Sequence, residues 1–181
     1  MKKTAICLIA IFTFININVQ AQAPRIPEAS PTQTIIQDFG LGKITITYSR
    51  PSVKGRVIFG GINPYGQVWR TGANAATVIS FSENVIMEGH SVPAGSYSLF
   101  TIPDKDMWTV ILNKTVKQWG AYSYKEADDF LRFQVKPKNL DEKRETSQFN
   151  LLTRQQNHQI CIWFGTILQY ISICKQTMTH K

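Results

Sequence analysis

The chain has 181 residues and a formal net charge of +8, and its hydrophobic and aromatic contents are ordinary for a globular protein. This length suffices for one domain with a substantial core and is too short for two ordinary domains once an N-terminal segment is removed. Between Gln22 and Asn150 the 15 basic and 12 acidic residues are mostly interspersed, which argues against a nucleic-acid partner.

The first 21 residues have the pattern of a secretory signal peptide. Lys2 and Lys3 form a positively charged start, an apolar run covers residues 5–15, and Ala21 and Ala23 each end a short motif at which a signal peptidase cleaves. The apolar run is about half of the roughly 20 residues that a membrane-spanning helix needs. We therefore expect export to the periplasm or the cell exterior, cleavage after residue 21 or 23, and no transmembrane span in the mature chain.

Cysteine usage agrees with this expectation. The three cysteines are Cys7, Cys161 and Cys174, so none lies between residues 22 and 150. Neither a disulfide framework nor a thiolate metal site holds this region together, and apolar burial and sheet pairing must stabilise it. The sequence predicts no cofactor.

Alternating patterns begin after a proline-rich lead-in at residues 22–31. Residues 43–49 alternate apolar and polar side chains, which predicts a half-buried strand. Gly40 and Gly42 suit a tight turn that pairs this strand with one near residues 34–38. Similar patterns predict strands at 76–81, 84–88, 96–102, 107–112 and 129–135, a further strand that opens at Thr146, and a short helical turn at 125–129.

Seven or more short strands separated by turn signals predict an all-β fold over residues 32–150. The architecture is either a β-sandwich or a barrel-like antiparallel domain. Residues 50–74 interrupt the pattern with seven glycines and prolines and are predicted to form one long loop. A loop of this length usually packs on itself or serves a function.

Several runs resemble a known family of secreted bacterial proteins. They are YSRPSVKGRVIFG at 48–60, VWRTGANAAT at 68–77, PAGSYSLF at 93–100 and WTVILN at 108–113. On these runs, the region from about Pro31 to Asn150 closely resembles domain-of-unknown-function family 2911. The family name carries no activity, so the resemblance implies a protein class and an exported location, and no mechanism.

Residues 151–181 form an atypical tail. The family resemblance implies a last strand that carries Trp-Asp/Glu-Asn-Thr. In this chain, no acidic residue occurs from Thr146 to Lys181. Synonymous codons for residues 159–171 permit a second reading frame that spells Trp-Asp-Asn-Thr. Two interpretations stay open: a frameshift between about Asn150 and Gln156, and a divergent but genuine C-terminus.

Residue types that carry catalysis are scarce. His90 is the one histidine between residues 22 and 150, and we expect it on a surface turn. The pairs Asp104/Asp106 and Asp128/Asp129 fit turn and helix-start roles better than acid–base catalysis. The sequence has no zinc, nucleophile-elbow or phosphate-loop motif, so it predicts no catalytic residue.

The long loop is the strongest candidate for a binding site. Guanidinium groups bind carboxylates or phosphates through paired hydrogen bonds, and aromatic faces stack on rings or sugars. The candidate ligand-binding residues are Tyr48, Arg50, Arg56, Tyr65, Trp69, Arg70 and Asn74. In the competing interpretation, the arginines tie the loop to backbone carbonyl groups and the tryptophan fills the core.

Two functional hypotheses follow. The first is a non-catalytic binding or structural module of the periplasm or cell exterior, with a small anion, a glycan or an envelope protein as its partner. The second is a hydrolase that acts on envelope or glycan material through an acid or an arginine of the loop. A carboxylate beside the arginines in an open cleft would favour the hydrolase, and arginines buried against carbonyl groups would favour a scaffold.

Overall fold

The computed structural model describes residues 26–137, 144–154, 159–164 and 170–175, with side chains described as far as Leu151. The predicted signal peptide therefore lies outside the described residues. Those residues form two antiparallel sheets, and their one helical element is a 3₁₀ turn, η1 (Glu126–Asp128). The predicted all-β fold is confirmed. The two sheets exclude a closed barrel and leave the sandwich-like alternative.

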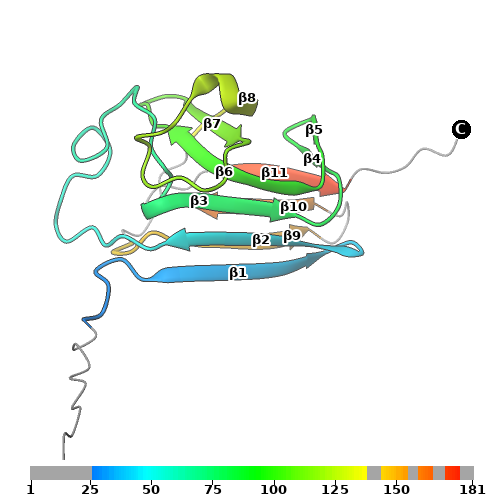
Figure 1. Cartoon of the computed structure of the whole chain (residues 1–181), viewed down its shortest axis with the longest axis horizontal. Helices are drawn as coiled ribbons and strands as arrows, with labels where there is room; N and C mark the ends of the chain where they lie inside the picture. The colour runs from blue at the N-terminus through cyan, green and yellow to red at the C-terminus, as the bar shows by residue number, and fades with distance from the viewer. Residues whose placement is uncertain (1–25, 138–143, 155–158, 165–169, 176–181) are drawn as a thin grey trace, which may run out of the picture.

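The larger sheet has the strand order β1-β2-β3-β6-β7-β8 (Figure 1). Its strands are β1 (Thr32–Phe39), β2 (Gly42–Ser49), β3 (Ala73–Phe81), β6 (Gly95–Ile102), β7 (Trp108–Asn113) and β8 (Asp129–Val135). Both glycines predicted at the β1–β2 turn have a steric role. Gly40 has a φ of 64°, and a Cβ on Gly42 would lie 2.4 Å from Ser82 Oγ.

The smaller sheet has the order β5-β4-β11-β10-β9 and lies behind the larger one in Figure 1. Its strands are β4 (Val85–Met87), β5 (His90–Val92), β9 (Phe149–Arg154), β10 (Gln159–Phe164) and β11 (Tyr170–Lys175). The expectation that His90 lies in a turn is wrong, because this residue begins β5. The turn is made instead by Glu88 and Gly89, whose φ values are 47° and 82°, as a two-residue hairpin turn requires.

The main core lies between the two sheets. Alternate residues of the larger sheet point into it, and β4, β5 and β9 close it from the other side. Fully burying one large apolar side chain contributes about 1.5–3 kcal/mol, so this core supplies the stability that the cysteine-free region needs. Its most deeply buried members include Ile44, Ile46, Ile79, Met87, Leu99, Trp108, Val110 and Leu112.

The opposite face of the larger sheet carries a second, smaller apolar cluster. It consists of Ala76, Phe100 and Ile111 and is covered by residues that include Ala121 and Tyr124. Ala121 and Tyr124 belong to the connection at 114–125, which precedes η1. The predicted long loop joins β2 to β3, and the 114–125 connection reaches the start of β3, where Gly120 N donates to Asn74 O at 3.0 Å. The region where the two connections meet holds the candidate site.

Candidate functional site

A cavity of about 270 Å³ opens within the β2–β3 loop. Among the seven predicted site residues, those that line it are Arg56, Trp69, Arg70 and Asn74. The remaining three lie outside its wall and are Tyr48, Arg50 and Tyr65. No described residue of the wall is Asp or Glu, so the cavity has cationic groups and no carboxylate of its own.

Backbone pairing fixes the segment that carries Trp69 and Arg70. The amide of Trp69 donates to the carbonyl of Thr101 (2.7 Å), and the reverse bond measures 2.9 Å. Thr77 N donates to Arg70 O at 3.2 Å. Thr71 follows with a φ of 54°, and its buried Oγ1 bonds to Thr101 Oγ1 at 3.2 Å. The cavity wall is thus anchored to the ends of β3 and β6.

The Trp69 indole belongs to the core as well as to the cavity wall. It is 6% exposed, and its Nε1 donates to Gly72 O at 3.1 Å. The ring makes edge contacts with Phe59 and Trp108, with centroids 5.4 and 6.5 Å away. The competing interpretation of this residue as core filling is therefore correct, although one side of the residue remains part of the wall.

Arg50 and Arg56 tie the loop to neighbouring backbone and hydroxyl oxygens. Arg50 Nε donates to Ser147 O (3.4 Å), and its Nη2 donates to Thr146 Oγ1 (3.1 Å). Arg56 curls back on its own loop, with bonds of 3.0 Å to Val53 O and 2.7 Å to Ser52 O. Both side chains hydrogen-bond to oxygen atoms of the protein, as the scaffold interpretation predicts, but Arg56 is exposed and not buried as that interpretation expects.

The Arg70 side chain behaves differently. Its Nε is buried and has no hydrogen-bond partner. No described residue forms an ion pair with its guanidinium, and this side chain is half-buried beside the cavity. A buried donor without a partner costs about 1–3 kcal/mol. Arg70 is therefore a cation whose hydrogen-bonding capacity the described fold does not use.

The last three predicted residues have structural surroundings. Tyr48 is buried in the core, where its hydroxyl donates to Gln33 Oε1 at 2.8 Å, and burial raises the pKa of this phenol. Asn74 adopts a φ of 57° and donates to Ser30 O at 3.3 Å. Tyr65 is 40% exposed and lies against Gly60 outside the cavity wall.

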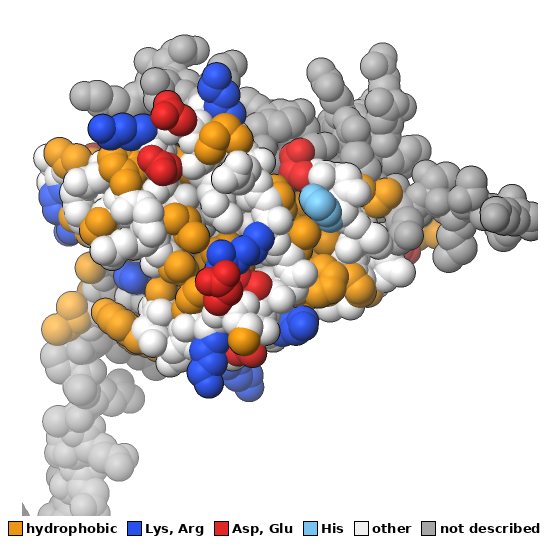
Figure 2. Space-filling view, turned by 90° about the horizontal axis from the view of Figure 1, so that it is seen from above, with side chains coloured by type: hydrophobic (Ala, Val, Ile, Leu, Met, Phe, Trp, Pro, Cys, Tyr) orange, Lys and Arg blue, Asp and Glu red, His pale blue; other side chains and the backbone are white. Residues whose placement is uncertain are grey.

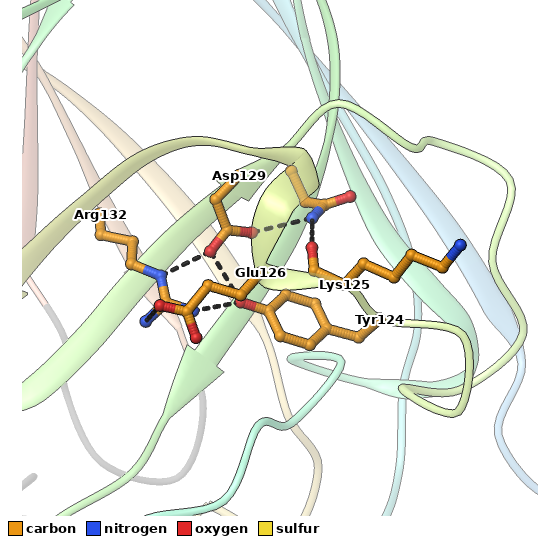
Figure 3. Close-up of polar contacts among 6 residues, drawn as sticks. Tyr124, Lys125, Glu126, Asp129 and Arg132 are labelled. Carbon is orange, nitrogen blue, oxygen red and sulfur yellow. Dashed lines mark hydrogen bonds and ion pairs between the residues drawn. The ribbon is translucent and has the colours of Figure 1, made fainter.

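A polar network that the sequence did not predict lies beside η1 and is drawn in Figure 3. The Asp129 carboxylate accepts hydrogen bonds from Asn113 Nδ2 (2.8 Å), Tyr124 OH (2.7 Å) and Arg132 Nε (2.5 Å). Arg132 also donates to the Tyr124 hydroxyl and lies 3.2 Å from Glu126 Oε1. These five residues, the Asp129 network, join β7, η1 and β8.

The environment of this network points to a structural role. The Asp129 side chain is 8% exposed. Burial, together with the hydrogen bond to Asp129, raises the pKa of Tyr124 to about 12. A phenol with this pKa stays protonated near neutral pH and cannot act as a base there. The sequence offered one signal, the amide Asn113 at the end of an apolar strand, but the register shift that brings it to Asp129 could not be read from it.

Charges of opposite sign are mixed on the face above β7, β8 and η1. Figure 2 shows Lys and Arg side chains next to Asp and Glu on this face, with no large area of one sign. The charges here largely compensate one another. The cavity at Arg70, whose described wall has no acidic residue, is a contrasting environment.

The fold and the site define a class, an antiparallel two-sheet protein with a cationic cavity in its longest described loop. The chain belongs to the family described as protein of unknown function (DUF2911), whose profile matches residues 30–169. This match confirms the family resemblance and extends it past Asn150. No curated protein and no solved structure matches the chain significantly.

Two further observations bear on the described residues. Within them, no helix has the length and apolar character of a membrane span. In the same part of the chain, His, Cys, Asp and Glu side chains form no group of three that could hold a metal ion.

Proposed function

We propose that the protein is a non-catalytic binding module whose loop cavity binds a small anion, a carboxylate or a phosphate, through Arg70. The observation that carries this proposal is the buried Arg70 Nε without a partner. A carboxylate or phosphate accepts hydrogen bonds from guanidinium N–H groups, and the Arg70 guanidinium lines the cavity without a described ion-pair partner, so such a ligand would bind it there.

The charge of the cavity supports an anionic ligand. Arg56 and Arg70 both line it, and its described wall includes no carboxylate that would neutralise them. Two uncompensated cations attract an anion over a distance of about 8 Å at physiological ionic strength. The backbone bonds between Trp69 and Thr101 hold Arg70 in place before binding, which lowers the entropy cost of association.

The composition of the wall favours binding over hydrolysis. A hydrolase of the kind considered above needs an acid or base beside the arginines. The candidate pair Asp104 and Asp106 is instead exposed in the β6–β7 connection and does not line the cavity. The wall offers hydrogen-bond donors for an anion, as a binding module requires.

Thermal unfolding of the full chain with inorganic phosphate tests this function. A ligand at about 100 times its dissociation constant stabilises by about 2.7 kcal/mol, which corresponds to several degrees in melting temperature for a chain of this size. We expect this shift in the wild type and its loss in Arg70→Gln. Sodium chloride at equal ionic strength controls for general salt effects.

Arg144→Gln is the matched control. Arg144 is exposed, does not line the cavity and bonds only to Gln148 Oε1 among described residues, at 3.0 Å. We expect this variant to retain the full phosphate shift. A wild type without a shift, or an Arg70→Gln variant that keeps it, would refute the proposed function.

We also propose that the protein acts outside the cytoplasm, on the basis of the N-terminal pattern at residues 1–21. Cell fractionation and mass spectrometry of the recovered chain test this location. We expect a periplasmic or extracellular product that lacks the first 21 or 23 residues. A cytosolic product that retains Lys2 would contradict the proposal.

For the tail, we propose the frameshift interpretation, with the shift between about Asn150 and Gln156. The absence of acidic residues after Glu145 supports it, as does the permitted Trp-Asp-Asn-Thr in the other frame. The family match as far as residue 169 and the pairing of β10 and β11 within the smaller sheet favour instead a divergent but genuine C-terminus. Nucleotide sequencing decides the question, because an intact frame without an alternative Trp-Asp-Asn-Thr string excludes the shift.

A further inference from the structure

Arg70 lies between two hollows. The second has a volume of about 260 Å³ and lies between the β2–β3 loop and the 114–125 connection. The two hollows share four lining residues, which are Ile62, Asn63, Trp69 and Arg70. Because these residues border both hollows, a ligand whose anionic group contacts Arg70 can extend into either one.

The second hollow presents an aromatic ring to solvent. Tyr122 lines it and is 88% exposed, although most large aromatic side chains are at least partly covered. Gly120 lies directly under this ring, because a Cβ at that position would be 2.7 Å from Tyr122 Cε2. The close backbone approach keeps the ring near the loop surface. Its free face is suited to stacking on a flat, partly apolar ring.

Amide side chains accompany the aromatic ring. Asn63 lines both hollows, and Gln67 lines the second. Side-chain amides offer both donors and acceptors, which matches the hydroxyl groups of a sugar. Neither hollow has a described acidic residue in its wall. Together the two hollows provide a cation at the centre, a ring platform on one side and amides on both.

We propose that the ligand is an acidic oligosaccharide of at least two pyranose units, with a carboxylate on Arg70 and a neighbouring sugar ring on Tyr122. This inference rests on the proposed anion-binding function and narrows it to a ligand class. Each hollow alone is slightly smaller than the 300–1,000 Å³ of typical ligand sites. A ligand longer than one sugar unit would occupy both hollows, whereas a single unit would occupy only one.

Isothermal titration of the full chain with galacturonic acid, digalacturonic acid and the neutral disaccharide cellobiose tests this inference. We expect digalacturonic acid to bind about fivefold more tightly than galacturonic acid, because stacking of one sugar ring on tyrosine adds about 1 kcal/mol. Cellobiose lacks the carboxylate and should not bind measurably.

Three tyrosine variants identify the platform. Tyr122→Ala should remove the advantage of the disaccharide, and Tyr122→Phe should restore it, because the ring and not the hydroxyl makes the contact. Tyr65→Ala is the matched control, since Tyr65 is a partly exposed loop tyrosine that lines neither hollow, and it should bind like the wild type.

Failure of this inference is separable from failure of the proposed function. Equal affinity for the acid and its dimer, or an advantage that survives in Tyr122→Ala, overturns the oligosaccharide ligand. If the phosphate shift still depends on Arg70, the anion-binding function stands in that case. If neither phosphate nor digalacturonic acid binds, both proposals fail.

Discussion

Arg132, in β8, and Arg70, in the β2–β3 loop, lie in opposite electrostatic surroundings. Arg132 donates to the nearly buried Asp129 carboxylate and lies 3.2 Å from Glu126. Arg70 has a buried Nε without a partner and borders two hollows whose described walls have no acid. The difference teaches that an arginine in this fold is structural or available for a ligand according to the partners that surround its guanidinium.

The comparison separates stability from binding. The Asp129 network joins β7, η1 and β8, so its loss should weaken the fold. Arg70 contributes no described side-chain bond, so its loss should affect ligands and leave the fold intact.

Asp129→Ala should have the largest effect on stability. The substitution removes an acceptor of three hydrogen bonds and leaves Arg132 without its closest carboxylate. We expect the free energy of unfolding in urea to fall by about 3 kcal/mol. Asp38→Ala is the control, because the Asp38–Lys43 pair has exposed side chains and should contribute less than about 1 kcal/mol. Equal losses in the two variants would show that the network has no special role.

High pH should weaken the same region through Tyr124. Its pKa is about 12 in the folded chain against the ordinary 10.0, mainly because of burial. Since the folded pKa is the higher one, this contribution is complete below about pH 10 and is lost as the pH rises toward 12. We expect the wild type to lose about 1–2 kcal/mol more than Tyr124→Phe over this interval, with solvent screening taken into account. Parallel pH profiles of the two proteins would contradict the raised pKa.

Arg56→Gln should have the smallest effect on phosphate binding. Arg56 lines the first hollow but already donates to Val53 O and Ser52 O. It should therefore assist an anion through charge at a distance, and its loss should weaken phosphate binding about threefold. We expect this difference to disappear near 1 M salt, where the screening length is about 3 Å. A salt-independent loss would instead indicate direct contact between Arg56 and the ligand.

The sequence predicted most of the larger sheet. Strict alternation of apolar and polar residues predicted β2 and the bounds of β8, and two glycines predicted the β1–β2 turn. These elements could be predicted because alternation and tight turns are local consequences of strand geometry. The three-residue strand β5 was missed because a run as short as His90–Val92 has too little periodicity to distinguish it from the adjoining turn. Strand length thus limited the prediction.

The candidate site was predicted in composition but not in detail. Four of seven proposed residues line the first hollow, yet nothing in the sequence indicated which arginine would lack partners. Arg50 reaches Ser147, which lies 97 positions along the chain, and only the folded sheets bring the two together. Tyr122 and Asp129 were missed for the same reason, since their roles depend on contacts between loops and strands.

Urea unfolding of Arg70→Met beside Arg132→Met, without ligand, tests most directly whether Arg70 is free for a ligand. Methionine preserves much of the apolar stem of arginine and removes the charge. We expect Arg132→Met to lower the free energy of unfolding by about 2 kcal/mol and Arg70→Met to keep or raise it, because this substitution removes a buried donor whose lack of a partner costs about 1–3 kcal/mol. A loss in Arg70→Met as large as that in Arg132→Met would show that Arg70 supports the fold, and the account of the site would be wrong.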